Sequence, residues 1–325
     1  MTENVQDDMA WVHVDGIEVD RAPRVVAVVV TYNRRPLLLE CLAAIRSQTR
    51  RTDAVIVVDN ASTDGTSDLV RADADLEAVV LTRNTGGAGG FAVGMTMALA
   101  EGADLLWLLD DDAVPEPDAL EELLRARDGV RGAPPVLMAS RVVWTDGRPH
   151  PMNTPRRRPF ASRSARAAAD VVGCIPIRSA SFVSTLVDAA ATRRMGLPRA
   201  DYFLWNDDFE FTTRLLRNDV GLLCPASVVV HKTSKFGSTA ADPGERFFYE
   251  VRNKIWTLTA PGTLHTAERV LYTGSTLRRW ARTFVRSKDR ATLLRAFVAG
   301  VKAALRNRPR PTSDVLAELG YRDAR

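Results

Sequence analysis

VVAVVVTYNR, residues Val25–Arg34, joins a run of apolar residues to a polar turn. An apolar run without alternation is typical of a strand that is buried on both faces of a parallel sheet. A helix is predicted from Pro36 onward, because Leu38, Leu42 and Ile45 recur at helical spacing. A buried strand followed by an amphipathic helix is the repeating unit of an α/β domain.

The same unit recurs farther along the chain. Further strands and helices alternate at Val55–Val58, Asp64–Arg71, Val79–Thr82, about Phe91–Glu101 and Leu105–Leu109. Short apolar strands separated by helices predict an α/β fold, in which a mostly parallel sheet carries helices on both faces.

The segments outside this series follow other patterns. Trp11–Asp20 alternates apolar and polar residues around Asp15-Gly16, which predicts an N-terminal β-hairpin. Gly132–Arg166 is rich in Pro and Arg and is predicted to be a loop. Strands and helices are predicted to resume at Val171–Ile177, Val187–Arg194, Asp207–Arg217 and Ser227–Val230, and the chain beyond Glu245 is predicted to be helical.

The predicted C-terminal helices are amphipathic and basic. Their apolar stripes consist of Leu277, Trp280, Ala281, Phe284 and Val285, and of Leu293, Leu294, Phe297, Val298, Val301 and Leu305. The chain carries a net charge of +4, but Leu264–Arg310 alone holds twelve Lys and Arg against two acids. Such helices suit an anionic membrane surface, or else their apolar stripes pack on the rest of the protein and their arginines are merely solvated.

Composition excludes several classes of protein. With 46% hydrophobic and 26% charged residues, the 325-residue chain can bury a core and is not a disordered protein. No apolar run approaches the roughly 18 residues that span a bilayer, and the acidic N-terminus lacks the apolar core of a secretory signal. Three widely spaced cysteines, Cys41, Cys174 and Cys224, argue against a disulfide framework and favour the reducing cytoplasm.

Polar residues follow each predicted strand, at the sheet edge where α/β proteins bind ligands. Three adjacent carboxylates, Asp110, Asp111 and Asp112, come directly after Leu105–Leu109. They repel one another unless a cation intervenes, and hard oxygen ligands favour Mg²⁺ or Mn²⁺. Asp110 and Asp112 point to the same side of an extended segment, so we expect these two to be the ligands. The alternative is a solvated acidic loop that caps the next helix.

A glycine-rich segment follows the strand at Val79–Thr82. Gly87–Ala92, GAGGFA, fits the loose dinucleotide-binding pattern, but that pattern belongs after the first strand of such a series. Two further interpretations remain, a loop that lets the backbone approach a ligand closely and a tight turn that needs small residues.

A second acidic cluster, Asp207, Asp208 and Glu210, opens a predicted helix. One acid would be enough for an N-cap, so another is available as a general base for an acceptor hydroxyl. His231 closes the strand Ser227–Val230 at the expected ligand edge. It is predicted either as a structural residue or as a further metal ligand.

As a set, these motifs resemble glycosyltransferase family 2, the inverting enzymes of the GT-A fold. The resemblance covers about Arg24 to His231 and includes Val25–Arg34, Val57–Asp64, the Asp110–Asp112 triplet, Asn206–Glu210 and His231. Asn84–Phe91 is similar to a loop of the actinobacterial galactofuranosyltransferase and rhamnosyltransferase branch. Asp242–Phe248, with Arg252-Asn253, is similar to a segment of the galactofuranosyltransferase that starts galactan on a polyprenyl-diphosphate lipid.

The resemblance implies roles for individual residues. Asp110, Asp112 and His231 would hold Mn²⁺ or Mg²⁺, and Asp208, with Asp207 beside it, would supply the catalytic base. The usual Glu-Asp pair of the family is Asp-Asp here. Asp59 would contact the nucleotide base. The other residues expected to bind the nucleotide sugar are Thr31, Asn33, Arg34, Asn84, Gly87 and Asp111.

The function expected from the resemblance is transfer of galactofuranose from UDP-galactofuranose to a hydroxyl of a polyprenyl-diphosphate-linked or cell-wall glycan. The expected place of action is the cytoplasm, at the inner face of the cell membrane, and no nucleic-acid partner is expected. The alternatives are a rhamnosyltransferase that uses dTDP-rhamnose, a metal-dependent nucleotidyltransferase, and a non-catalytic binder of membranes or nucleic acid.

The resemblance also implies a division of the chain. An N-terminal extension, residues 1–22, would precede a GT-A catalytic domain at 23–260. That domain would consist of a nucleotide half, 23–112, and an acceptor half, 113–260. A basic helical region, 261–325, would follow it.

Overall fold

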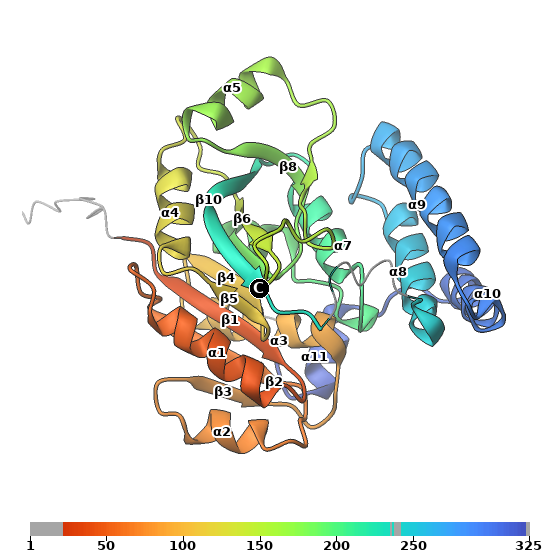
Figure 1. Ribbon diagram of the computed structural model, residues 1–325, viewed down its shortest axis with the longest axis horizontal. Helices are drawn as coiled ribbons and strands as arrows, with labels where there is room; N and C mark the ends of the chain where they lie inside the picture. The colour runs from red at the N-terminus through yellow and green to blue at the C-terminus, as the bar shows by residue number, and fades with distance from the viewer. Residues whose placement is uncertain (1–21, 235, 237–241, 323–325) are drawn as a thin grey trace, which may run out of the picture.

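The computed structural model describes residues 22–234, 236 and 242–322 (Figure 1). Within this part of the chain, one ten-stranded sheet has the order β3-β2-β1-β4-β9-β6-β10-β8-β7, and β5 pairs with β10 outside that path. The hairpin predicted at Trp11–Asp20 lies outside the described residues.

The first half of the sheet is parallel. Its strands and their helices are β1 (Val25–Thr31), α1 (Arg35–Arg46), β2 (Ala54–Asp59), α2 (Thr66–Ala72), β3 (Glu77–Val80), α3 (Gly86–Ala100) and β4 (Leu105–Asp110). Val26, Val28 and Val30 join the core on one face, whereas Val25, Ala27 and Val29 join the core on the other. Burial on both faces explains the unbroken apolar run of β1, and the predicted α/β class is confirmed.

The second half of the sheet is mixed. Its elements are β5 (Ala113–Pro115), α4 (Ala119–Asp128), β6 (Leu137–Val143), β7 (Arg156–Arg157), α5 (Arg163–Val171), β8 (Ile175–Ser179), β9 (Ser184–Asp188), α6 (Ala189–Met195), η1 (Ala200–Tyr202), α7 (Asp207–Leu215) and β10 (Gly221–His231). The strand β9 runs antiparallel to both β4 and β6, and β10 runs parallel to β6.

The prediction of a loop at Gly132–Arg166 is wrong in part. This segment contains β6, β7 and the first turn of α5. All residues of β6 except Arg141 are buried, because the strand lies between β9 and β10 inside the sheet. Its polar and small residues concealed the strand pattern.

The helix predicted from about Phe91 begins five residues earlier, at Gly86. The glycine-rich segment is therefore the first turn of α3, and its glycines allow close packing within the protein. A Cβ on Gly86 would lie 1.9 Å from the carbonyl oxygen of Phe203, and one on Gly90 would lie 2.5 Å from Cγ1 of Val30. Gly86 also has a φ of +69°, which favours glycine.

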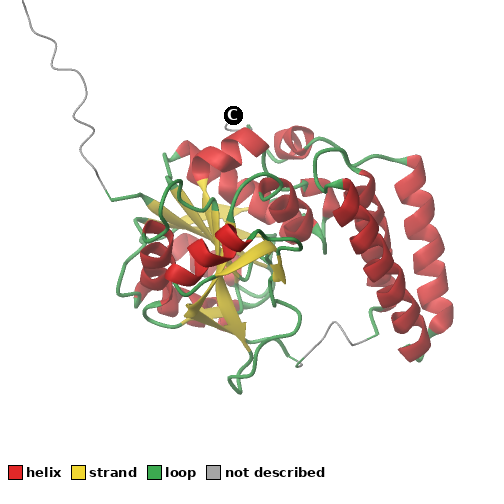
Figure 2. Cartoon of the chain, turned by 90° about the horizontal axis from the view of Figure 1, so that it is seen from above, coloured by secondary structure: helices red, strands yellow, loops and turns green. Residues whose placement is uncertain are grey.

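The C-terminal part of the described chain is helical, as predicted. It contains η3 (Gly244–Arg246), α8 (Phe247–Thr259), α9 (Thr266–Arg286), α10 (Arg290–Arg306) and α11 (Thr312–Glu318). The helices α8, α9 and α10 stand together beside the sheet, whereas α11 returns to pack near α3 (Figures 1 and 2). Among the described residues, no helix combines the length and apolar character that crossing a membrane requires.

The apolar stripes of α9 and α10 are divided between packing and solvent. Trp280 and Leu293 are buried in a cluster with Phe247 of α8. By contrast, Leu277 is 57% exposed and Leu305 is 77% exposed. The other exposed apolar residues of these two helices are Val270, Leu271, Val285, Leu294 and Val298. Packing on the rest of the protein therefore uses only part of the predicted stripes.

Candidate active site

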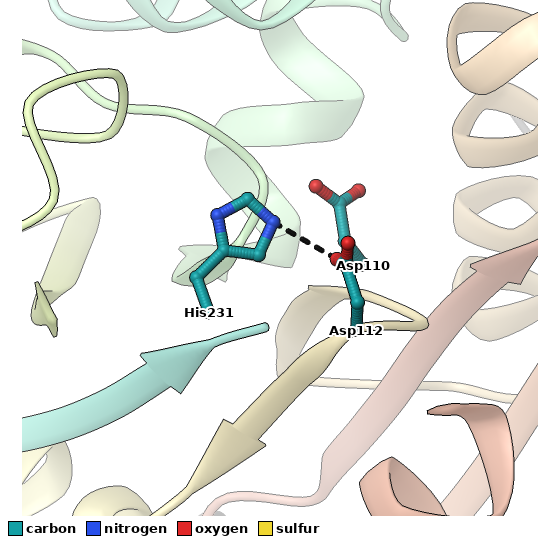
Figure 3. A group of neighbouring side chains, drawn as sticks. All are labelled: Asp110, Asp112 and His231. Atoms are coloured by element: carbon teal, nitrogen blue, oxygen red, sulfur yellow. Dashed lines mark hydrogen bonds and ion pairs between the residues drawn. The ribbon is translucent and has the colours of Figure 1, made fainter. Parts of the chain in front are cut away.

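Asp110, Asp112 and His231 come together from two strands that are not neighbours in the sheet (Figure 3). Asp110 ends β4 and His231 ends β10, and β9 and β6 lie between these strands. The short strand β5 brings the ends of β4 and β10 together. It begins directly after Asp112, and its Ala113 pairs with His231 of β10. One possible ligand atom from each of the three side chains lies within 4.8 Å of the others.

The donor set fits a hard or borderline divalent cation. Nε2 of His231 lies 2.9 Å from Oδ1 of Asp112, and its Nδ1 lies 2.8 Å from Oδ1 of Asn153. Since an amide oxygen only accepts hydrogen bonds, Nδ1 carries a proton, and Nε2 is the atom turned toward the carboxylates. Two carboxylates and one imidazole suit Mn²⁺ or Mg²⁺.

The charges of this group are strongly coupled. Burial and the charge of Asp112 raise the pKa of Asp110 to about 7. Burial would also raise the pKa of Asp112, but its hydrogen bond to His231 and the nearby charges of His231 and Arg34 lower it instead. Buried carboxylates that lie this close together create a strong negative field, which favours a metal ion.

Asp111 is not part of the group formed by Asp110, Asp112 and His231, which we call the metal-ligand group. Its Oδ2 accepts a hydrogen bond of 2.8 Å from the Thr31 hydroxyl, and Nη1 of Arg34 lies 3.2 Å from its Oδ1. The same Nη1 lies 2.6 Å from Oδ2 of Asp112. Arg34 thus bridges Asp111 and the metal-ligand group, and burial raises the pKa of Asp111 to about 6.

The other residues predicted to bind the nucleotide sugar make contacts within the protein. Asp59 is fully buried and accepts hydrogen bonds from the hydroxyls of Ser62 and Ser67. Oδ1 of Asn33 accepts a hydrogen bond of 2.7 Å from the backbone N–H of Thr63. These contacts shape the loop that follows β2, and the Asp59 carboxylate does not face open space.

The start of α3 is held by side-chain amides. Oδ1 of Asn84 accepts a hydrogen bond of 2.7 Å from the N–H of Gly86. Oδ1 of Asn60 accepts from both the N–H and the hydroxyl of Thr85, at 3.1 and 2.9 Å. Gly87 faces the second acidic cluster, because a Cβ built on it would lie 3.9 Å from Oδ2 of Asp207.

The second acidic cluster forms the first turn of α7. Glu210 is ion-paired with Arg214 at 2.8 Å, so it has a structural role. Asp207 and Asp208 have no cationic partner within 4 Å among the described residues. Burial and the charge of Asp208 raise the pKa of Asp207, and burial raises the pKa of Asp208. Both are therefore stronger bases than ordinary aspartates once they are ionised.

The backbone before α7 is strained. Phe203, Trp205 and Asn206 have positive φ angles of 64°, 64° and 65°. Nδ2 of Asn253 in α8 lies 2.9 Å from each of the carbonyl oxygens of Tyr202, Leu204 and Trp205. The segment Arg252-Asn253 of the sequence thus fixes the loop that carries the acidic cluster.

Known proteins match both the chain and its fold. The family described as Glycosyl transferase family 2 matches residues 26–182. Galactofuranosyltransferase GlfT1 of Mycobacterium tuberculosis is 34% identical over 260 residues, which cover 73% of this chain and 83% of that protein. The GlfT1 of Mycolicibacterium smegmatis is 31% identical over 259 residues, or 73% of this chain and 84% of that protein.

The chain belongs to glycosyltransferase family 2.

Solved structures agree with the GT-A fold of this family. The crystal structure of S. aureus TarS 1-349 has a TM-score of 0.59 and 16% identity, with 86% of this chain and 81% of that chain covered. The same protein in complex with UDP-GlcNAc gives a TM-score of 0.58 and 17% identity over the same shares. The resemblance stated from the sequence is therefore confirmed at the level of family, fold and glycosyltransferase activity.

Sequence reasoning missed several residues of this glycosyltransferase site. Asn153, whose Oδ1 lies 2.8 Å from Nδ1 of His231, is in the segment expected to be a loop and was not singled out. Arg156, Glu250 and Lys254 surround Asp208 from β7 and α8. No local motif marks them, because only the fold brings these elements together.

Proposed function

We propose that this glycosyltransferase moves galactofuranose from UDP-galactofuranose to a hydroxyl of a lipid-linked glycan, with inversion and with the help of Mn²⁺ or Mg²⁺. The convergence of Asp110, Asp112 and His231 at the sheet edge is the observation that carries the metal-dependent mechanism. The choice of sugar is supported by the two mycobacterial galactofuranosyltransferases that the chain resembles over nearly three quarters of its length.

Asp110, Asp112 and His231 would hold the cation, and Asn153 would keep the His231 ring in place. A divalent cation bound there would neutralise the negative charge that builds on the departing nucleoside diphosphate. Arg34 already lies beside Asp111 and Asp112, so its guanidinium is close enough to share in binding the diphosphate.

Asp208 is proposed as the general base, with Asp207 as the alternative. The base takes the proton of the acceptor hydroxyl while its oxygen attacks the anomeric carbon from the face opposite the leaving group. One displacement breaks the bond between sugar and diphosphate and inverts the anomeric centre. No covalent enzyme intermediate is required.

The nucleotide is proposed to lie along the ends of β1, β2 and β4. Thr31, Asn33, Arg34, Asp59, Asn84, Gly87 and Asp111 are the residues proposed to shape this pocket. Asp59 and Asn33 act through the loop that begins at Ser62, since their own oxygens are bonded to that loop. TarS, which shares the fold, is known in complex with UDP-GlcNAc.

The exposed apolar stripes of α9 and α10 are proposed to meet an anionic membrane surface at the inner face of the cell membrane. Leu277 and Val285 lie on α9, and Leu294, Val298 and Leu305 lie on one stripe of α10 by their spacing. Exposed arginines flank these stripes at Arg278, Arg282, Arg286, Arg295 and Arg306. Basic amphipathic helices bind anionic lipid by this combination. The division into a catalytic domain at 23–260 and a basic region at 261–325 belongs to this proposal.

The experiment for the transfer reaction measures nucleotide release from a panel of donors, with a lipid-linked rhamnosyl acceptor mimic, Mn²⁺ or EDTA. We expect UDP release from UDP-galactofuranose, which EDTA and Asp112→Asn each abolish. Asp118→Asn, an exposed acid at the start of α4, is the matched control and is expected to retain activity. Release of dTDP from dTDP-rhamnose, and of no nucleotide from the other donors, would mean that the enzyme is a rhamnosyltransferase.

Vesicle co-sedimentation tests the membrane contact. We expect the protein to sediment with phosphatidylglycerol vesicles and to remain in solution with phosphatidylcholine vesicles. Leu294→Glu and Val298→Glu should abolish sedimentation, whereas Val171→Glu, at an exposed valine of α5, should not. Equal sedimentation of all three variants would refute this part of the proposal.

A further inference from the structure

Three basic side chains from three elements gather beside Asp208. Arg156 comes from β7, Lys254 from α8 and Arg279 from α9. Nζ of Lys254 lies 3.9 Å from the centre of the Phe209 ring, and the guanidinium carbon of Arg156 lies 5.3 Å from the same centre. We call these three residues the basic cluster.

Two members of the basic cluster have no anionic partner. Lys254 is only 3% exposed, yet among the described residues its ammonium group makes no hydrogen bond and no ion pair within 4 Å. Within the described part of the chain, the guanidinium of Arg156 also makes no hydrogen bond and no ion pair, and it lies over the rings of Phe209 and Tyr272. Cation–π contacts compensate for only part of the hydration that a buried cation loses.

The carboxylate of Glu250, which attracts Lys254, is already engaged by other groups. One oxygen of Glu250 binds Arg279 and accepts a hydrogen bond of 3.1 Å from Nε1 of Trp280. The other accepts a hydrogen bond of 2.8 Å from Nδ2 of Asn206. Burial, together with the charges of Arg279 and Arg156, lowers the pKa of Lys254 to about 7. The three basic side chains of the cluster thus outnumber the two carboxylates that act on them, Glu250 and Asp208.

The basic cluster neighbours Asp208, whereas Asp207 lies near the start of α3. Neighbouring residues of a helix point about 100° apart. Asp207 is turned toward Gly87 at the start of α3, and the charge of Asp110 helps to raise its pKa. Asp208 lies close to the basic cluster, because Lys254 and Arg156 lie over the ring of the next residue, Phe209, and their charges oppose the rise in the pKa of Asp208. A ligand of this cluster is thus separated from the metal-ligand group by the aspartate pair.

We propose that Arg156, Lys254 and Arg279 bind a phosphate or diphosphate group of the acceptor substrate. The inference rests on the proposed function and deepens it, because it assigns the residues that would bind the diphosphate of a lipid-linked acceptor. An anion with two or more negative charges would neutralise the buried Lys254 and give Arg156 the oxygen partners that it lacks.

The test is a calorimetric titration of octyl diphosphate into the full-length protein in the presence of EDTA. Without a divalent cation, the group around Asp112 is unable to bind the diphosphate through a metal. We expect Lys254→Met and Arg156→Met each to weaken binding at least tenfold. Lys288→Met and Arg163→Met, exposed basic residues outside the basic cluster, serve as controls and should stay within twofold of the wild type.

Further measurements test whether the bound anion is that of the acceptor or that of the nucleotide, and whether the variants fold. UDP in EDTA should compete weakly with octyl diphosphate. If UDP bound more tightly and lost its affinity in Lys254→Met, the cluster would belong to the departing nucleotide, and the acceptor assignment would be overturned. Unchanged binding of octyl diphosphate in both variants would also overturn it. Thermal melting verifies folding, and Lys254→Arg should retain binding.

The kinetic counterpart compares two acceptors that differ only in the diphosphate. In Lys254→Met, KM should rise at least tenfold for the diphosphate-bearing acceptor and remain within twofold for the same glycan on an uncharged octyl chain. An equal loss of kcat with both acceptors would mean that Lys254 acts on Asp208 alone. A failure of every sugar donor would refute the proposed function, while the titration in EDTA would still decide the anion site.

Discussion

At the scale of single residues, the position of the His231 ring depends on Asn153. Oδ1 of Asn153 lies 2.8 Å from Nδ1 of His231, which directs Nε2 to the carboxylates. Partners of this kind typically alter metal affinity by about 10- to 100-fold. We therefore expect Asn153→Ala to weaken Mn²⁺ binding by at least tenfold, measured by calorimetry without substrate. Asn218→Ala, at an exposed position before β10, should leave Mn²⁺ binding unchanged.

Lys254 gives a second prediction at this scale, on the pH dependence of stability. Burial lowers its pKa to about 7, whereas an unfolded lysine titrates near 10.4. Between these values the unfolded state binds a proton that the folded state lacks, so stability rises with pH. Below pH 7 both states are protonated, and the full cost of the buried charge remains.

The matched measurement is urea denaturation of the wild type and Lys254→Met at pH 6, 8 and 9.5. The variant should gain most stability over the wild type at pH 6, and the gain should shrink as the pH rises. The other charged groups that face Lys254 are Glu250, Arg279, Arg156 and Asp208. A difference between the two proteins that does not change with pH would contradict the depressed pKa.

At the scale of elements, α8 holds the strained loop that precedes α7. Three residues with positive φ, each costing about 1–3 kcal/mol, persist only where their surroundings enforce them. Asn253 supplies that enforcement through three carbonyl contacts. Asn253→Ala should let the loop relax, displace Asp207 and Asp208, and lower kcat at least tenfold while the protein still folds.

The control for this prediction lies in the same helix. Thr259→Ala changes an exposed residue at the end of α8 and should leave kcat unaltered. Limited proteolysis should show faster cleavage near Trp205 in Asn253→Ala than in the wild type. Normal turnover in Asn253→Ala would mean that the loop keeps its conformation without the amide.

The repeating strands and helices of the first half could be predicted because each is determined by its own residues. Val25–Val30 is apolar throughout since both faces of β1 are covered. β6 could not be predicted, because Ser140 and Arg141 interrupt its apolar residues and its burial comes from strands elsewhere in the chain. The start of α3 could not be predicted for a related reason. Its glycines are required by close packing against Val30 and Phe203, whereas glycine has a low helix propensity.

The residues of the candidate site also divide into those that the sequence could predict and those that it could not. Asp110, Asp112 and His231 could be predicted because each ends or follows a strand at the ligand edge of the sheet. Lys254 and Arg156 could not, because they approach Asp208 from α8 and β7, and no spacing within the sequence relates them. Residues that act through tertiary contacts are visible only in the folded chain.

At the scale of the whole molecule, a buried ion pair joins the helical region to the sheet. Arg178 of β8 is fully buried, and its Nε lies 2.6 Å from Oε1 of Glu268 near the start of α9. Its Nη2 lies 2.9 Å from Oε2 of the same glutamate and 3.0 Å from the carbonyl oxygen of Thr263. This bidentate contact fixes where α9 begins, and with it the position of Arg279 in the basic cluster.

Removing one partner of this pair should destabilise the protein much more than removing both. Glu268→Ala leaves the Arg178 guanidinium buried without a counter-charge, which typically costs about 3–5 kcal/mol. Replacing both residues, in Arg178→Met with Glu268→Leu, removes the two charges together and should restore most of the unfolding free energy in urea denaturation. Glu318→Ala breaks exposed ion pairs with Arg83 and Arg310 and should leave the unfolding free energy nearly unchanged. Because the double variant lacks the bidentate contact, it should also bind octyl diphosphate more weakly than the wild type, although it folds. Equal stability of Glu268→Ala and the double variant would mean that water reaches Arg178 and that α9 is held by its apolar contacts alone.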